Sequence, residues 1–235
     1  MKERVQKIIA QSGLCSRRTA ESWIAEGKVT INGRKATIGA DADPTRDHIC
    51  VDGKPLHGKE QKRYLMLYKP RGFVTTMKDE RGRKNVSQLV KKCSCRVYPV
   101  GRLDVDSEGL LIMTNDGELT HKLTHPSHEI TKTYTVTVRG NLENIPSLAE
   151  PMDIDGYMIK PATVFILNQK ENQARLEIRI HEGRNRQIRK MCEKCGFTVH
   201  RLKRLSVGNL QLDSSLPVGK WRELTQSEIS YLRSL

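Results

Sequence analysis

The stretch "VGRLDVDSEGLLIMTNDG", residues 100–117, joins a charged segment to a short apolar run. Residues 110–113 of this stretch have the composition of a buried strand. Asp104 lies before the run, after an Arg-Leu pair. If residues 102–106 are extended, Asp104 and Asp106 point to one side and the apolar residues between and before them point to the other. The stretch therefore predicts a core strand with two carboxylates near its start.

Three interpretations of these acids are open from the residues alone. The first is a surface turn with solvated carboxylates, because Asp is common in turns. The second is a magnesium-dependent nuclease, since hard cations prefer oxygen ligands, here Asp104 and Asp106 with Glu108 or Asp116. The third is a single nucleophilic or general-base Asp104, which requires a nearby cation if the site is partly dry.

Apolar strand patterns recur along the rest of the chain. Residues 64–68 are almost continuously apolar, and two later segments alternate apolar with polar residues, as half-buried strands do. The alternating apolar residues are Tyr134, Val136, Val138, Leu176, Ile178 and Ile180. Helices are predicted at about residues 185–195 and 225–234, the second of which opens on a Thr-x-x-Glu capping box. These elements predict an α+β domain over residues 63–235 with a mixed, largely antiparallel sheet.

Residues 1–57 have the pattern of a separate small module. Two short amphipathic segments predict helices, the second capped by Ser16 and stopped by Gly27. Alternating segments around Asn32-Gly33 and Asp52-Gly53 then predict two hairpins, because these dipeptides favour tight turns. The sequence thus predicts an α–α–β module, followed by the polar linker "LHGKEQKR" at residues 56–63.

The charge balance indicates a polyanionic partner. The chain has 235 residues, with 41 Lys and Arg against 27 Asp and Glu, and its formal net charge is +14. Nucleic acid is the favoured partner for such a chain. A membrane partner is not expected, because no apolar run approaches the ~20 residues that span a bilayer. The first residues lack the apolar stretch of a signal peptide, so we expect a cytoplasmic protein.

Two basic clusters are candidates for binding phosphates. Residues 181–204 carry eight Lys and Arg against two Glu, and a Gly-Arg-Asn-Arg turn precedes the expected helix, whose N-terminus favours an anion. The first module places further cations around its second helix and first turn. The candidate RNA-binding residues are Arg17, Arg18, Lys28, Arg34, Arg102, Arg184, Asn185 and Arg186.

Six cysteines raise the question of metal binding. Cys93-x-Cys95 and Cys192-x-x-Cys195 do not match the paired spacing of a zinc ribbon. Cys192 and Cys195 lie at helical spacing with other apolar residues, which favours a buried helix face. We therefore expect neither a metal site nor a disulfide.

The motifs resemble those of known families. "SGLCSRRTAESWIAEGKVTING" closely resembles the RNA-binding domain of small-subunit ribosomal protein S-four. "GRLDVDSEGLLIMTNDG", "KTYTVTVRG" and "HEGRNRQIRKM" resemble, in that order, the ribosomal RNA pseudouridine synthases of the RsuA/RluB/RluE/RluF family. The segment "EGRNRQIRKM" is most similar to the large-subunit RluB type.

This resemblance implies isomerisation of uridine to pseudouridine in ribosomal RNA or pre-ribosomal particles, with 23S favoured over 16S. It implies no cofactor, no metal, no obligatory protein partner and a monomer. Asp104 would be the essential catalytic residue, as nucleophile or base, and Arg189 would pair with it. Tyr134 would stack on the target uracil, and Arg102 would occupy the space left by the flipped uridine or bind its phosphate. A ribosome-binding protein without catalysis is the alternative that rests on the module and charge alone.

Overall fold

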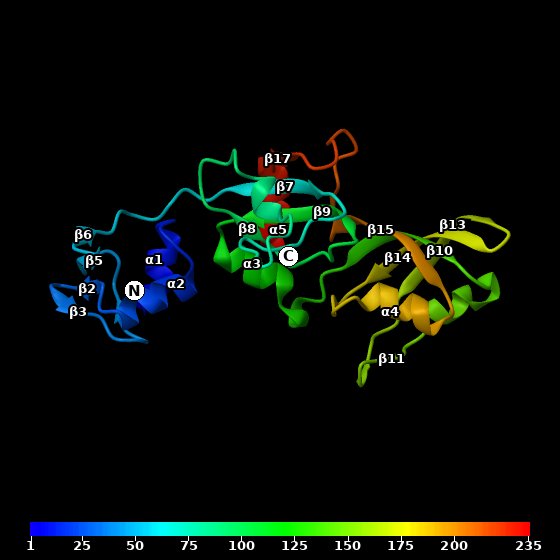
Figure 1. The fold of residues 1–235 in the computed structure, drawn as a ribbon, viewed down its shortest axis with the longest axis horizontal. Helices are drawn as coiled ribbons and strands as arrows, with labels where there is room; N and C mark the ends of the chain where they lie inside the picture. The colour runs from blue at the N-terminus through cyan, green and yellow to red at the C-terminus, as the bar shows by residue number, and fades with distance from the viewer. The chain divides into compact units, whose positions relative to one another are not determined.

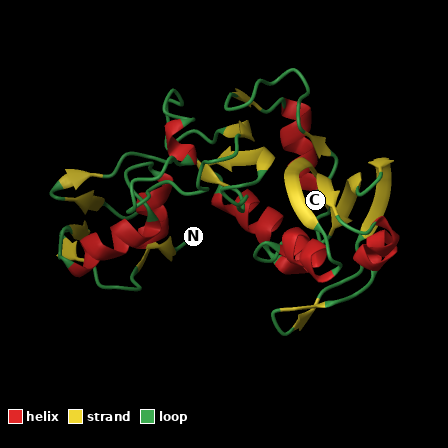
Figure 2. Ribbon diagram, turned by 45° about the vertical axis from the view of Figure 1, so that its right-hand side comes forward, coloured by secondary structure: helices red, strands yellow, loops and turns green.

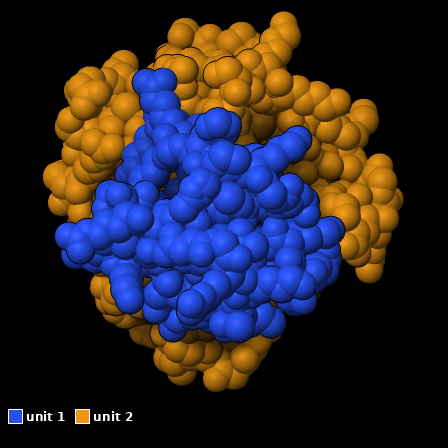
Figure 3. Space-filling view, turned by 90° about the vertical axis from the view of Figure 1, so that its left-hand side faces the viewer, with its two compact units in different colours: residues 1–62 blue, residues 63–235 orange.

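The computed structural model describes all 235 residues, which form two compact units, Met1–Lys62 and Arg63–Leu235. Figure 3 shows the two units in different colours. The division falls inside the polar linker, residues 56–63.

The first unit contains the two helices and the hairpins that the sequence predicts. Ser16 caps the second helix, because its hydroxyl accepts a hydrogen bond from the Thr19 amide at 3.0 Å. Asn32 and Gly33 both have positive φ, 51° and 79°, as a tight hairpin turn requires. The four-stranded sheet has the order β3-β2-β5-β6, and β1 pairs with β4. The elements are β1 (Glu3–Arg4), α1 (Val5–Gln11), α2 (Arg17–Ala25), β2 (Val29–Ile31), β3 (Arg34–Lys35), β4 (Asp41–Ala42), β5 (Ile49–Val51) and β6 (Lys54–Pro55).

The second unit is built on a nine-stranded sheet with the order β13-β14-β10-β15-β9-β7-β17, in which β16 pairs with β15 and β8 with β9 (Figure 1). All pairs are antiparallel except β15 with β9. The predicted α+β class with a largely antiparallel sheet is therefore confirmed. The strands are β7 (Tyr64–Lys69), β8 (Tyr98–Pro99), β9 (Glu108–Thr114), β10 (Lys132–Arg139), β13 (Thr163–Lys170), β14 (Gln173–Ile180), β15 (Thr198–Val207), β16 (Leu210–Gln211) and β17 (Trp221–Glu223).

Helices flank this sheet (Figure 2). The capping box at the start of α5 is present as predicted, whereas α3 was not predicted from the sequence. Asp116 caps α3 by accepting hydrogen bonds from the amides of Glu118 and Leu119. The remaining elements are η1 (Val86–Gln88), α3 (Gly117–Thr124), η2 (Pro126–His128), η3 (Leu142–Ala149), the pair β11 (Asp153–Ile154) and β12 (Tyr157–Met158), α4 (Gln187–Lys194) and α5 (Gln226–Ser234).

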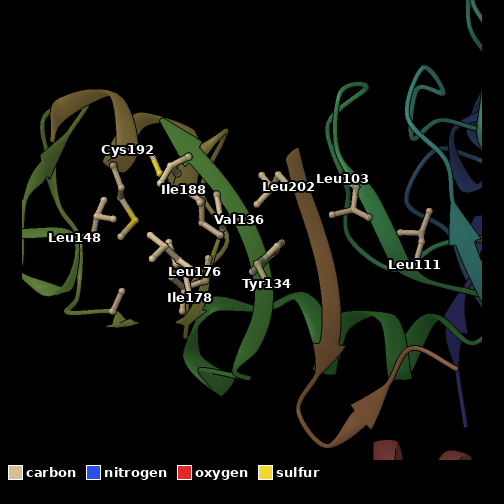
Figure 4. Close-up of a cluster of buried hydrophobic side chains, with 14 of the residues drawn as sticks. Leu103, Leu111, Tyr134, Val136, Leu148, Leu176, Ile178, Ile188, Cys192 and Leu202 are labelled. Atoms are coloured by element: carbon tan, nitrogen blue, oxygen red, sulfur yellow. The ribbon is translucent and has the colours of Figure 1, made fainter. Parts of the chain in front are cut away.

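The largest apolar cluster joins the alternating strands to α4 and η3. Figure 4 shows its members, with Tyr134 on β10 and Leu202 on the neighbouring β15. Cys192 and Cys195 lie in this cluster, which confirms the predicted buried helix face. No helix of the protein is both long enough and apolar enough to cross a membrane.

The two halves of the sheet meet where β9 runs parallel to β15. Glu108 pairs with Lys203 and Gly109 with Arg204. A Cβ on Gly109 would lie 2.2 Å from the carbonyl oxygen of Arg204, and the φ of Gly109 is +112°. Glycine is therefore required at this junction, both for space and for backbone conformation.

We expect Gly109→Ala to lower the free energy of unfolding by about 2–4 kcal/mol, because the methyl group forces the strands apart at a strained φ. Chemical denaturation measures this change. Gly58→Ala is the control, since nothing lies within 4 Å of its Cβ position. Equal stability of the two variants would contradict the role of Gly109.

Candidate active site

A cavity of about 640 Å³ opens at the parallel junction of the sheet. Its walls come from the loop before β9, the start of β10, the segment between β14 and α4, and β15. The cavity brings together six of the residues singled out from the sequence: Arg102, Asp104, Tyr134, Arg184, Asn185 and Arg186. Arg189 lies on α4 and is not one of the residues that line the cavity.

The backbone around Asp104 turns instead of running straight. The Ser107 amide donates to the Asp104 carbonyl at 3.1 Å, which closes a turn over residues 105 and 106. As a result Leu103 is buried at 7% exposure, while Val105 is 44% exposed. The expectation that these two apolar side chains share one side of an extended segment is therefore wrong, because tertiary contacts bend the chain.

A buried lysine holds this turn in place. The Nζ of Lys69 donates to three carbonyl oxygens, those of Pro70 at 3.1 Å, Asp104 at 2.9 Å and Ser107 at 2.8 Å. Lys69 is fully buried, and its burial lowers the pKa of the side chain to about 8. Sequence reasoning missed Lys69, although a lysine that ends an apolar strand and precedes Pro-Arg-Gly was a visible signal.

A second side chain supports the same loop. Thr75 donates its hydroxyl hydrogen to the Leu103 carbonyl at 2.6 Å and accepts from the Leu103 amide at 3.2 Å. The Gly72 amide donates to the Val105 carbonyl at 2.6 Å. Hydrogen bonds from Gly72 and Thr75, which follow β7 in the chain, thus hold the loop on both sides of Asp104.

Arginines from the start of α4 meet the two acids. Arg189 pairs with Asp106, with Nε 3.2 Å from Oδ2, and its Nη2 donates to the Asp106 carbonyl at 3.0 Å. Arg186 lies 3.3 Å from Asp106 Oδ1 and 3.9 Å from Asp104 Oδ2. The structure therefore pairs Arg189 with Asp106 instead of the expected Asp104, because the turn after Asp104 carries Asp106 toward α4.

Asp104 is left with a partly exposed and only loosely paired carboxylate at the cavity wall. Its side chain is 29% exposed, and the ion contact with Arg186 is loose at 3.9 Å. Asp106, by contrast, is held by two guanidinium groups. Cations so close to both acids do not suit a magnesium ion, and the chain holds no group of three or more His, Cys, Asp or Glu that could bind a metal.

Tyr134 lies on β10 between Ile178 of β14 and Arg204 of β15. It is 7% exposed, lines the cavity, and belongs to the large apolar cluster (Figure 4). Its hydroxyl makes no hydrogen bond within the protein. An aromatic face at the cavity wall can hold a planar ring by stacking.

Exposed basic groups surround the mouth of the cavity. β14 ends at Ile180 and α4 starts at Gln187, so the predicted strand-turn-helix arrangement is present. Arg184 lies over the ring of Tyr157 and pairs with Glu182. Asn185 and Arg102 are exposed at the cavity wall.

The basic candidates of the first unit lie around α2 and the first hairpin. Arg17 and Arg18 are exposed in the first turn of α2, and Arg34 is exposed on β3. Lys28, also exposed, pairs with Glu26 at 2.6 Å. Three of the four candidate cations thus have no carboxylate partner.

Protein-family models match parts of both units. The family model for RNA pseudouridylate synthase matches residues 63–194, and that for the S4 domain matches residues 3–42. The chain is 42% identical to ribosomal large subunit pseudouridine synthase B of Bacillus subtilis, covering 99% of this chain and 96% of the relative. It is 37% identical to an uncharacterized RNA pseudouridine synthase of Aquifex aeolicus, covering 99% and 94%. A crystal structure of a pseudouridylate synthase superposes with a TM-score of 0.70 at 33% identity, covering 97% and 99%.

We expect Lys69→Met to lower the free energy of unfolding by about 2–3 kcal/mol, because three buried or partly buried hydrogen bonds to carbonyl oxygens are lost. Chemical denaturation measures this. The exposed Lys78→Met is the matched control and should change stability little. A Lys69→Met protein as stable as the control would show that the loop does not depend on these hydrogen bonds.

Proposed function

The chain belongs to the RNA pseudouridylate synthase family, whose members isomerise uridine to pseudouridine, and we propose that its substrate is the ribosomal RNA of the large subunit. The relatives support this choice. Ribosomal large subunit pseudouridine synthase B of Vibrio cholerae is 36% identical over the whole chain, in addition to the Bacillus subtilis relative. The net charge of +14 and the S4 domain suit a structured RNA.

Asp104 is the proposed catalytic carboxylate. The reaction breaks the bond between N1 of uracil and C1′ of the ribose, turns the base, and joins C5 to C1′. An ionised carboxylate serves either as a nucleophile at C1′ or as a base that removes a sugar proton. The observation that carries this assignment is the position of Asp104: its carboxylate is partly exposed in the cavity that Tyr134 also lines, and its backbone carbonyl is held by Lys69.

Arg189 and Arg186 are proposed to hold the acids in position. Arg189 binds both the carboxylate and the backbone carbonyl of Asp106. It thereby holds the turn that follows Asp104. Arg186 offsets the charge of the two carboxylates. Arg189 therefore acts on Asp104 through Asp106 and through the backbone.

Tyr134 and Arg102 are proposed to stabilise the flipped uridine and the RNA around it. Uracil must leave its stack before any protein group reaches the sugar, and the ring of Tyr134 offers a face for it. Arg102, exposed at the cavity wall, is placed to bind a phosphate or to fill the vacated space. Arg184, Asn185 and Arg186 present further donors to the RNA backbone.

We propose a monomer without an obligatory protein partner, because Asp104 and Tyr134 line a cavity whose walls are formed within one chain. No cofactor is proposed, because the isomerisation consumes neither redox equivalents nor energy. We propose that the reaction takes place in the cytoplasm, because the Bacillus subtilis and Vibrio cholerae relatives are bacterial and bacteria make their ribosomal RNA there.

We expect Asp104→Asn to abolish pseudouridine formation while the affinity for RNA stays within a few-fold, because the amide keeps the shape but loses the charge. Single-turnover assays on large-subunit RNA, with binding measured in parallel, test this. Val105→Ala is a control in the same turn with an exposed side chain. Substantial turnover by Asp104→Asn would remove Asp104 from the mechanism.

We expect the double variant Arg17→Ala, Arg18→Ala to weaken RNA binding and to reduce its salt dependence. Each lost phosphate contact lowers the slope of log K against log salt by roughly 0.7–0.9. Binding titrations at several salt concentrations measure the slope. Arg46→Ala, Lys54→Ala removes the same charge from other exposed positions of this unit. A slope equal for the two double variants would mean that α2 does not contact the RNA.

A further inference from the structure

Two cations in the cavity wall have no carboxylate partner. Lys132 and Arg204 both line the cavity, and neither takes part in any ion pair of the structure. Both lie beside Tyr134, since Lys132 precedes it by two residues on the same face of β10 and Arg204 is its register partner on β15. The ring proposed to hold the uracil is therefore flanked by two positive charges.

Arg204 is the more deeply placed of the two. It is 4% exposed, and its Nε donates to the Leu110 carbonyl at 2.8 Å. Its Nη2 is buried and has no hydrogen-bond partner. A buried guanidinium nitrogen without an acceptor costs free energy, so an acceptor supplied by a ligand would be stabilised there.

Lys132 is half-buried at the start of β10. Its Nζ donates to the Ile130 carbonyl at 2.9 Å, which leaves two of its three hydrogens for other acceptors. Burial and the neighbouring Arg204 lower the pKa of Lys132 to about 8, so the side chain is still mostly charged at neutral pH.

The carboxylates of the cavity do not neutralise this pair. Glu129 is paired with Lys160, and Glu182 with Arg184. The remaining carboxylate, Asp104, has its ion contact with Arg186. Two adjacent cations in a partly dry site repel each other, and an anionic group between them relieves that repulsion.

We propose that Lys132 and Arg204 form an anion site that stabilises the negative charge on uracil while the base is detached from the sugar. The inference rests on the proposed function. When the N1–C1′ bond breaks, its electron pair stays on N1, and the charge spreads to the two carbonyl oxygens of the base. The charge is consumed when C5 bonds to C1′; C5 then loses its proton and N1 gains one, so the product is an isomer of the substrate.

The position of the site favours a base over a phosphate. Arg204 is 4% exposed and is the register partner of Tyr134, so it is shielded from a phosphate backbone. Arg102, Arg184 and Arg186 are exposed, as side chains that bind phosphates usually are. Donors aimed at developing charge in a water-poor site act on the rate of the chemical step. The loss of such a donor therefore lowers the rate more than the affinity.

The central test is Lys132→Met, which removes the charge and keeps the length of the chain. We expect the single-turnover rate at saturating RNA to fall on the order of 100-fold, as for other lost charge-stabilising donors. The Kd for RNA should change little, and the Tm should be unchanged or higher because a desolvated cation is gone. Lys91→Met, at an exposed position, is the control. Arg204→Lys is a second variant, which keeps the positive charge but lacks the planar guanidinium and its fixed set of N–H donors.

A substrate variant separates charge stabilisation from positioning. RNA with 5-fluorouridine at the target position releases a base whose anion is intrinsically more stable, because fluorine withdraws electrons. C5 of this base has no proton to lose, so the rate is read from the appearance of the C5-linked fluorinated base. The rate ratio between the parent and Lys132→Met should then be smaller on the fluorinated RNA than on the uridine RNA. An equal ratio on both RNAs would overturn the proposal.

Other outcomes are also decisive. A Lys132→Met enzyme with the parent's rate, while the parent is active and Asp104→Asn is not, would overturn the anion site and leave the proposed function intact. A loss of affinity and of salt dependence at an unchanged saturated rate would assign the pair to a phosphate and overturn the role in base departure. A parent protein without activity on any ribosomal RNA would overturn the proposed function itself.

Discussion

The three hydrogen bonds from Lys69 are the constraint on which the site depends. They connect Lys69, at the end of β7, to the loop that carries Asp104 and leads into β9. Gly109 lets β9 approach β15 at the same place, because no side chain separates the two backbones. The result is a sheet whose halves meet at a short parallel junction, with the loop of Asp104 fixed at its edge.

The electrostatics of the cavity follow from this arrangement. Once the turn after Asp104 is fixed, Asp106 faces α4 and takes up Arg189 and Arg186. Asp104 then keeps a partly exposed carboxylate, while β10 and β15 add Lys132 and Arg204, which line the same cavity beside Tyr134. The cavity thus places the proposed catalytic carboxylate among several cations, which suits an anionic polymer whose base is proposed to depart with negative charge.

The sequence predicted much of the frame because its signals are local. Apolar alternation located β10 and β14, the Asn-Gly and Asp-Gly turns located the hairpins, and the capping box located α5. α3 was missed because its only buried residues are Leu119 and Leu123, too few for a clear stripe. Its cap, Asp116, was considered only as a metal ligand.

The site was harder to predict because it depends on contacts between distant segments. Lys69 and Asp104 are 35 residues apart, and nothing in the local pattern shows that one supports the other. The bend at residues 105–106 likewise arises from tertiary hydrogen bonds, and it places Asp106 against Arg189 in place of the Asp104 that the resemblance implied. The three sequence motifs nevertheless identified residues that meet in one cavity: Asp104, Tyr134 and the arginine-rich turn before α4. Each of them lies in or next to a strand or helix that the sequence predicted.

The most direct test of the account is a map of pseudouridines in both ribosomal RNAs, from cells that contain the protein and from cells that lack it. The account predicts that a pseudouridine in the large-subunit RNA disappears without the protein, and that every site in the small-subunit RNA remains. Retention of all large-subunit sites, or a loss confined to the small-subunit RNA, would contradict it.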